Sequence, residues 1–122
     1  MTSVELWKSL VDAFAGLHDG VHRAWVVDRG AYPDFEENQN KNDLLKSLSK
    51  EQREVLADML IEARRGGIHD TLVVLHDRIA LNDGAYCEHG VRMELEPFGN
   101  TLYQDYVARR EGDEWEDYDQ RI

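Results

Sequence analysis

Apolar side chains recur every three or four residues through the first 29 positions of the chain, with polar side chains between them. This spacing predicts one long amphipathic helix from Ser3 to about Arg29, with Ser3 as its N-cap and Glu5 in its first turn. Gly16 and Gly20 are weak points at which such a helix can bend. The apolar stripe consists of Leu6, Trp7, Leu10, Val11, Phe14, Leu17, Val21 and Trp25.

The middle of the chain alternates between breaker residues and helical patterns. Residues 30–42 carry Gly, Pro and a polar run, which predicts a loop of a dozen or more residues. A short helix is expected over about 43–48. Ser49 and Gln52 then form a capping-box pattern ahead of a further apolar stretch, and the glycine pair 66–67 is expected to end that helix.

The helical pattern of residues 68–82 is apolar almost all round, so this helix is the expected central and most buried element. Turn residues at 82–84 end it. Apolar and charged residues alternate over 91–96, after a turn candidate at 88–90. This change of period from helical to alternating predicts a small β-hairpin.

A Pro-containing turn at 96–99 leads to a last helix, which begins at a capping box formed by Thr101 and Gln104. The expected fold class is therefore α+β and mostly α, with about five helices around a central buried helix and one small β-hairpin. We expect residues 1–122 to form a single acidic globular domain with an acidic aromatic C-terminal tail at about 111–122.

Charge narrows the range of functions. The 122 residues include 14 Lys and Arg against 25 Asp and Glu, a net charge of -11. Nucleic acids and anionic membranes attract proteins through Lys and Arg, so neither is an expected partner. The apolar runs are too short to span a membrane and the N-terminus lacks a secretory pattern, so we expect a cytoplasmic protein. The single cysteine, Cys87, fits a reducing compartment.

Acidic residues are concentrated near the C-terminus. Six carboxylates fall within the nine residues 111–119, together with two aromatic side chains. Such aromatic side chains are common anchors at protein interfaces, and an acidic rim steers a basic partner toward them. The predicted partner-binding residues are Glu111, Asp113, Glu114, Trp115, Glu116, Asp117 and Tyr118. The alternative is a solvated acidic terminus whose Trp115 folds back onto the body of the protein.

The histidines suggest a different site. His18 and His22 lie four residues apart in the first predicted helix, and His69 and His76 lie seven apart in the central one, so each pair shares a helix face. Four imidazoles from two packed helices would suit a divalent transition metal such as zinc, nickel or iron. The simpler interpretation is that these histidines border the apolar stripes and hydrogen-bond locally, without a cofactor.

Several short motifs are distributed over residues 69–115. They are His69-Asp70, Leu81-Asn82, Glu96-Pro97-Phe98-Gly99, Leu102-Tyr103 and Val107-Ala108-Arg109-Arg110-Glu111-Gly112-Asp113. With these motifs the segment resembles a family of small bacterial proteins that have no assigned function. The resemblance implies a bacterial origin and brings no activity and no functional residue with it.

No nucleophile elbow and no glycine-rich phosphate loop occurs in the sequence. We therefore expect a small acidic binding protein, not an enzyme, that docks a basic protein partner in the manner of an inhibitor or immunity protein. Two alternatives stay open: a metal-dependent helical-bundle enzyme that uses the four histidines, and a DNA-mimic inhibitor. A homodimer is also left open, because Trp7 and Trp25 lie on one line of the first predicted helix and belong either to the core or to a dimer seam.

Overall fold

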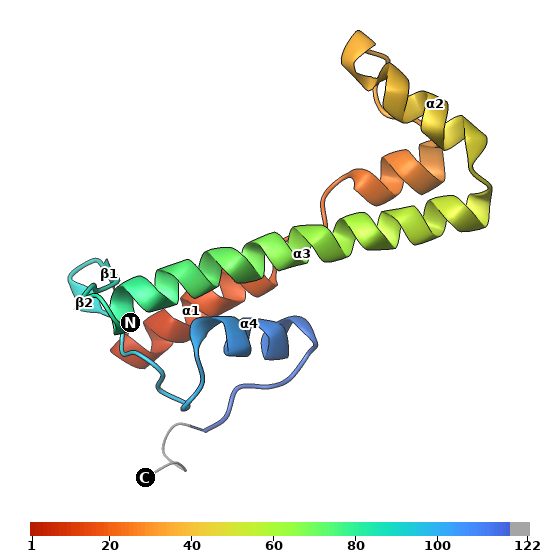
Figure 1. Ribbon diagram of the computed structural model, residues 1–122. Helices are drawn as coiled ribbons and strands as arrows, with labels where there is room; N and C mark the ends of the chain where they lie inside the picture. Colours follow the sequence, from red (N-terminus) through yellow and green to blue (C-terminus); the bar gives the residue numbers. More distant parts are fainter. Residues whose placement is uncertain (118–122) are drawn as a thin grey trace. The chain divides into compact units, whose positions relative to one another are not determined.

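The structure, a computed structural model, describes residues 1–117 (Figure 1). Its helices are α1 (Ser3–Ala15), a π-helical segment (Ala24–Arg29), a 3-10 turn (Glu36–Asn38), α2 (Gln39–Ser47), α3 (Lys50–Ala80) and α4 (Leu102–Arg110). Two short strands, β1 (Cys87–Glu88) and β2 (Val91–Arg92), pair antiparallel with Cys87 opposite Arg92. The predicted fold class, α+β and mostly α with one small hairpin, is confirmed.

Contacts divide the chain into two compact units. Unit 1 comprises residues 1–17 and 67–122, and unit 2 comprises residues 18–66. The second boundary falls inside α3, so this helix contributes its first part to unit 2 and its last part to unit 1. Unit 2 is inserted in the sequence between α1 and the remainder of unit 1. That the chain forms a single domain stays a prediction.

The start of α1 is fixed by a capping box. The Glu5 amide donates to Thr2 Oγ1 at 3.1 Å, and the Thr2 amide donates to Glu5 Oε2 at 2.8 Å. The N-cap is therefore Thr2, one residue before the predicted Ser3. The reciprocal pair satisfies two amide groups that the helix itself leaves without an acceptor.

The predicted long first helix is wrong beyond Ala15, where α1 ends. Gly20 takes a left-handed φ of +87°, and helical structure resumes shortly before the π-helical segment Ala24–Arg29. Glycine lowers helix stability and tolerates this backbone conformation. Leu17 and Val21 are each 49% exposed, so the break costs little apolar burial. The apolar spacing continues across a stretch that does not pack as a helix.

The predicted end of a helix at glycines 66–67 is also wrong, because α3 runs unbroken from Lys50 to Ala80. Its start is as predicted: the Gln52 amide donates to Ser49 Oγ at 3.1 Å and the Ser49 amide to Gln52 Oε1 at 2.9 Å. Glycine costs about 1 kcal/mol in a helix interior. Buried residues on both sides of the pair, including Ala57 and Leu72, offset that cost by anchoring each half of the helix in a core.

The loop expected over 30–42 is shorter than predicted. Helical structure begins with the 3-10 turn Glu36–Asn38 and continues directly into α2. The remaining loop is tied to α2 by the Asn42 side chain, whose Oδ1 accepts from the Tyr32 amide at 2.7 Å and whose Nδ2 donates to the Tyr32 carbonyl at 3.2 Å. An amide side chain that matches both backbone groups holds Tyr32 in a fixed position.

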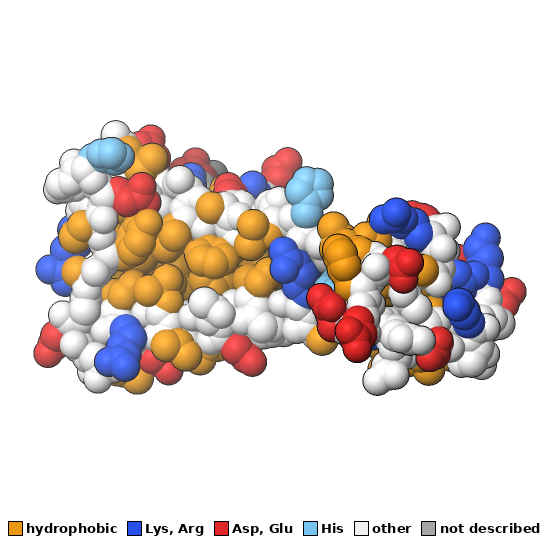
Figure 2. Space-filling view, turned by 90° about the horizontal axis from the view of Figure 1, so that it is seen from above, with side chains coloured by type: hydrophobic (Ala, Val, Ile, Leu, Met, Phe, Trp, Pro, Cys, Tyr) orange, Lys and Arg blue, Asp and Glu red, His pale blue; other side chains and the backbone are white. Residues whose placement is uncertain are grey.

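In unit 1, α1, the last part of α3, the hairpin segment and α4 enclose one hydrophobic core. The buried members are Leu6, Trp7, Val11, Leu72, Met93, Phe98, Leu102 and Tyr106. Figure 2 shows that hydrophobic side chains also form a continuous area on the face of this unit seen from above, with charged groups around its edge.

Unit 2 has its own smaller core, made by Val26, Val27, Leu45 and Ala57. Tyr32 packs against this core, and the Trp25 ring lies 5.2 Å from the Tyr32 ring. Trp7 is fully buried in the core of unit 1, so the two tryptophans belong to different units. Among residues 1–117, no helix has the length and apolar character that a membrane span requires.

Candidate functional site

The acidic segment 111–117 turns back onto unit 1 and places Trp115 against the body of the protein. The indole Nε1 of Trp115 donates to Asp12 Oδ2 in α1 at 3.0 Å. Its ring lies 5.3 Å from the Phe98 ring, and the Arg109 guanidinium lies 5.0 Å from its centre. Trp115 is thus held on three sides by α1, α4 and the turn before α4.

Arg109 organises this attachment. Its Nε donates to Asp12 Oδ1 at 2.8 Å and its Nη2 to Asp12 Oδ2 at 3.4 Å, while Nη1 donates to the Asp113 carbonyl at 2.7 Å. The chain can reverse after α4 because Gly112 takes a φ of +95°, a conformation that favours glycine. The guanidinium therefore joins α1, α4 and the returning segment.

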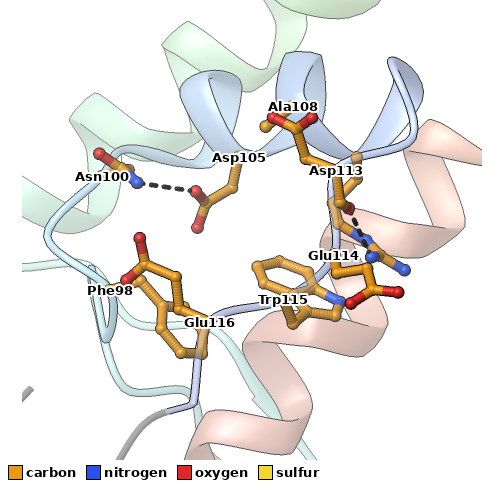
Figure 3. Close-up of a pocket in the computed structure, with 9 residues that line it drawn as sticks. Phe98, Asn100, Asp105, Ala108, Asp113, Glu114, Trp115 and Glu116 are labelled. Atoms are coloured by element: carbon orange, nitrogen blue, oxygen red, sulfur yellow. Dashed lines mark hydrogen bonds between the residues drawn. The ribbon is translucent and has the colours of Figure 1, made fainter. Parts of the chain in front are cut away.

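A cavity of about 150 Å³ opens between α4, the turn that precedes it and the returning segment (Figure 3). We call it the acidic pocket. Its lining residues are Phe98, Asn100, Asp105, Ala108, Arg109, Asp113, Glu114, Trp115 and Glu116. Figure 3 shows Asp105 from α4 and Glu116 from the returning segment directed into the same space, beside the rings of Phe98 and Trp115.

Asp105 is the most buried polar residue of the pocket, at 5% exposure. Trp7 Nε1 donates to its Oδ2 at 2.9 Å, and Asn100 Nδ2 donates to its Oδ1 at 3.2 Å. A carboxylate fixed by two donors on rigid elements is pre-oriented, so binding to it requires little reordering. Its neighbour Glu116 is exposed and belongs to the rim.

The electrostatics of the acidic pocket favour a cation. Four of its lining residues are acidic: Asp105, Asp113, Glu114 and Glu116. Within the part of the lining that the structure describes, the cation is Arg109, whose guanidinium is bound to Asp12 and to a backbone carbonyl. Hydrogen bonds between a cationic donor and carboxylates are among the strongest in proteins, and the faces of Trp and Phe attract cations further.

The structure distributes the seven predicted partner-binding residues over three groups. Four line the acidic pocket: Asp113, Glu114, Trp115 and Glu116. Two, Glu111 and Asp117, are exposed and do not line it. Tyr118 lies outside the described residues. Trp115 folds back as the alternative interpretation had it, yet remains half-buried at the rim.

Sequence reasoning missed the wall of the pocket that comes from α4 and its preceding turn. Asp105 carried a usable signal, because it lies three residues after Leu102 and directly before Tyr106, both of which are buried. A carboxylate on the apolar face of an amphipathic helix needs partners and therefore marks either a structural network or a site. Phe98 and Asn100 carried no such signal.

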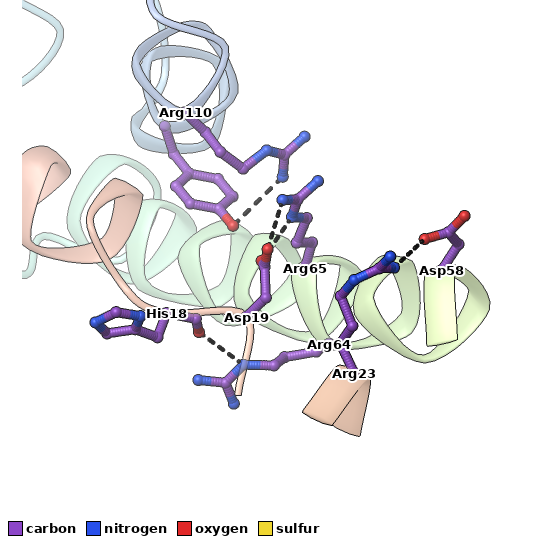
Figure 4. A network of polar contacts seen from close by, with 8 residues as sticks. His18, Asp19, Arg23, Asp58, Arg64, Arg65 and Arg110 are labelled. Carbon is purple, nitrogen blue, oxygen red and sulfur yellow. Dashed lines mark hydrogen bonds and ion pairs between the residues drawn. The ribbon is translucent and has the colours of Figure 1, made fainter. Parts of the chain in front are cut away.

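The structure does not join the first two candidate histidines on a helix face, because α1 ends before them. His18 is exposed, and its carbonyl accepts from Arg64 Nε at 3.1 Å (Figure 4). His22 Nδ1 lies 3.0 Å from the hydroxyl oxygen of Tyr32. Both residues belong to unit 2 and take part in local contacts.

The other two candidate histidines lie in unit 1 and contact α4. The His69 ring packs against Tyr103 at 5.2 Å. His76 is buried, with Nδ1 accepting from the Leu102 amide at 3.2 Å and Nε2 at 3.3 Å from Glu96 Oε2. Among residues 1–117, no group of three or more His, Cys, Asp or Glu side chains is arranged to hold a metal ion.

Figure 4 also shows the contacts that hold the loop around His18 and Asp19 to α3. Arg65 donates from Nε to Asp19 Oδ1 at 3.0 Å and from Nη2 to Asp19 Oδ2 at 2.9 Å, a two-point pair. Arg23 and Asp58 lie 3.6 Å apart and are both largely exposed, so their ion pair contributes little stability. Asp19 is therefore a structural partner of Arg65.

The chain belongs to a family described as "Family of unknown function (DUF6547)", whose model matches residues 1–117. The match extends well beyond the segment 69–115 that carried the resemblance in the sequence. No curated protein and no solved structure was found to match the chain.

Proposed function

We propose that this protein is a binding protein whose acidic pocket receives a cationic side chain of a basic protein partner. The observation that carries the proposal is the pocket itself: aromatic rings and four acidic residues surround a cavity of about 150 Å³. Among the described residues of the lining, Arg109 is the cation, and it already pairs with the carboxylate of Asp12. An incoming Lys or Arg would add a positive charge beside these four acidic residues.

Charge distribution supports a protein partner over a small cation. Unit 1 holds 15 of the 25 acidic residues and 6 of the 14 basic ones, so it carries -9 of the net -11. Such a field accelerates the encounter with a positively charged surface and aligns it before contact. The pocket has room for one side chain, so further affinity would come from the exposed carboxylates around it, including Glu111 and Asp117.

Covering a cationic surface is how an inhibitor or immunity protein would use this arrangement. The rigid base at Asp105 would fix one side chain of the partner, and the exposed rim would adapt to its neighbours. Because exposed charge pairs are screened by salt, the complex would weaken steeply as ionic strength rises. A cationic active site of a partner would be blocked by such docking.

The test is binding of defined cationic peptides to the full chain, measured by calorimetry at low salt. We compare four peptides: one with a single Arg between neutral residues, one with a single Lys, an Arg-rich peptide and its Glu-rich counterpart. We expect the Arg-rich peptide to bind, the Glu-rich peptide not to bind, and the double substitution Glu114→Gln/Glu116→Gln to weaken binding about tenfold or more, the loss of roughly 1.4 kcal/mol.

A matched control separates the pocket from net charge alone. Glu54→Gln/Glu62→Gln removes two exposed carboxylates from α3 in unit 2 and changes the total charge equally. We expect this control to retain nearly all the affinity. Equal weakening by both double substitutions would show that the peptide responds only to overall charge, and the proposal would then be abandoned.

A further inference from the structure

Unit 2 contains a second cavity, of different chemistry, which is separate from the acidic pocket. It measures about 220 Å³ and is lined by Val26, Tyr32, Lys41, Leu44, Leu45, Leu56 and Leu60. Five of these seven residues are aliphatic. For comparison, an apolar cavity of about 150 Å³ inside a protein is large enough to bind benzene. All its lining residues belong to unit 2, so its shape depends on that unit alone.

Three helical elements and the loop that carries Tyr32 build this apolar pocket. α2 supplies Lys41, Leu44 and Leu45, α3 supplies Leu56 and Leu60, and the π-helical segment supplies Val26. Val26 and Leu45 are buried, whereas Leu44 is 52% exposed. The buried residues form the base, and Leu44 borders the opening to solvent. A large aliphatic side chain left half in water at the mouth would gain burial from an apolar ligand.

Of the described residues that line this pocket, Lys41 is the charged one. Its Nζ donates to Asn38 Oδ1 at 3.1 Å and lies 5.4 Å from the centre of the Tyr32 ring. Both contacts are with neutral groups, and among the described residues no carboxylate lies within ion-pair distance of this ammonium. The ammonium is therefore positioned at an apolar cavity and available to a carboxylate.

Tyr32 is fixed in place on the other side. Its backbone is held by Asn42, and its hydroxyl lies 3.0 Å from His22 Nδ1. The ring therefore forms a rigid wall beneath the Lys41 ammonium. An apolar wall, an aliphatic base and one cation at the mouth complement a molecule with a hydrocarbon part and one negative end.

We propose that the apolar pocket of unit 2 binds a small carboxylic acid with an alkyl chain, its hydrocarbon part between α2 and α3 and its carboxylate on Lys41. This inference is independent of the partner proposed for unit 1. The aliphatic walls contribute most of the affinity, and the ammonium selects for the negative charge.

Sodium octanoate is the probe, titrated into the full chain and followed by the backbone and methyl resonances of the protein. We expect saturable shifts of Leu44, Leu56 and Leu60 with a Kd at or below the millimolar range, and unchanged resonances for the core of unit 1. Octylamine has the same chain with the opposite charge, and we expect it to bind at least about fivefold more weakly.

Lys41→Gln tests the ammonium, and Lys46→Gln is the matched control, because it removes the same charge from α2 at a position outside the lining. We expect octanoate affinity to fall about fivefold or more in the first variant and to stay within twofold in the second. The unit 2 spectrum without ligand shows whether each variant is folded.

Three results would overturn the inference. The first is no saturable shift up to about 10 mM octanoate, roughly tenfold above a millimolar Kd. The second is octylamine binding as tightly as octanoate, and the third is an equal loss of affinity in both lysine variants. Leu60→Phe adds a readout that does not depend on charge, because a larger side chain fills the cavity and should reduce octanoate and octanol binding together.

Discussion

Trp7 in α1 donates its indole N–H to the carboxylate of Asp105 in α4 at 2.9 Å, across 98 positions of sequence. Both residues are buried, and Asn100 holds the second carboxylate oxygen. The same bond that joins two helices of the core therefore orients the base of the acidic pocket. Stability and the proposed binding are coupled at this point.

Asp105→Ala should lower the free energy of unfolding by about 1–3 kcal/mol, because it leaves the buried Trp7 N–H without an acceptor. Asp105→Asn keeps an oxygen for that N–H, so we expect a smaller loss. Urea denaturation of both variants measures the difference. If the two substitutions cost the same, the hydrogen bond is not the source of the stability.

Trp115→Ala should destabilise unit 1, because it removes the contacts with Phe98 and Arg109 and the hydrogen bond to Asp12. The expected loss is about 1–3 kcal/mol in denaturant unfolding. Trp115→Phe retains an aromatic ring and should recover part of that loss. A Trp115→Ala protein as stable as the parent would show that the returning segment does not pack onto unit 1.

Substitutions of two sets of glycines should act in opposite directions. In α3 a Cβ at Gly66 or Gly67 would meet no atom within 4 Å, so each Gly→Ala change should raise stability by about 0.5–1 kcal/mol through helix propensity. Gly30→Ala should destabilise, because Gly30 has a φ of +69°, which L side chains rarely adopt, and the Arg53 guanidinium would also have to move aside.

Thermal unfolding of the three alanine variants tests these signs. The midpoint should rise for the two α3 variants and fall for Gly30→Ala. A fall for both α3 variants would contradict the prediction, because helix propensity would then not determine the effect of alanine at Gly66 and Gly67.

Tyr86 provides a pH-dependent signal. Its hydroxyl donates to Glu88 Oε2 at 2.7 Å, and this bond, followed by burial and the Glu88 charge, raises the pKa of Tyr86 above its ordinary value. Because the folded pKa is the higher one, the resulting stability is fully present below about pH 10. It is lost as the pH rises through the folded value.

Glu88→Gln should therefore lower the pKa of Tyr86 toward its ordinary value. The Tyr86 ring resonances follow the titration directly, with Tyr86→Phe identifying them. A pKa that does not change in Glu88→Gln would exclude the hydrogen bond as its cause.

Local signals in the sequence predicted local structure well. The capping boxes at Ser49 and Thr101 and the turn at 96–99 are present, the last with the Gly99 amide donating to the Glu96 carbonyl at 3.0 Å. These features depend on residues three apart. Sequence alone was sufficient because no distant partner is needed to form them.

Features that depend on distant packing were not predictable in this way. Glycines 66–67 looked like a helix end, and only burial of residues on both sides carries α3 through them. The acidic tail was recognised from its composition, but its pocket needs Asp105 and Phe98, whose proximity to Trp115 arises from the fold of unit 1. The break after α1 had a signal in the sequence, namely Gly16 and Gly20. The apolar spacing continues past both glycines, and it therefore led to the prediction of one unbroken helix.

The insertion of unit 2 within unit 1 sets an order of events during synthesis on the ribosome. All residues of unit 2 emerge as one continuous stretch, so this unit can fold early. Trp7 has to wait for Asp105, so the core around α1 is complete only when α4 has been made. Until then, part of the apolar face of the first helix stays uncovered, and exposed apolar surface of this kind promotes aggregation of a nascent chain.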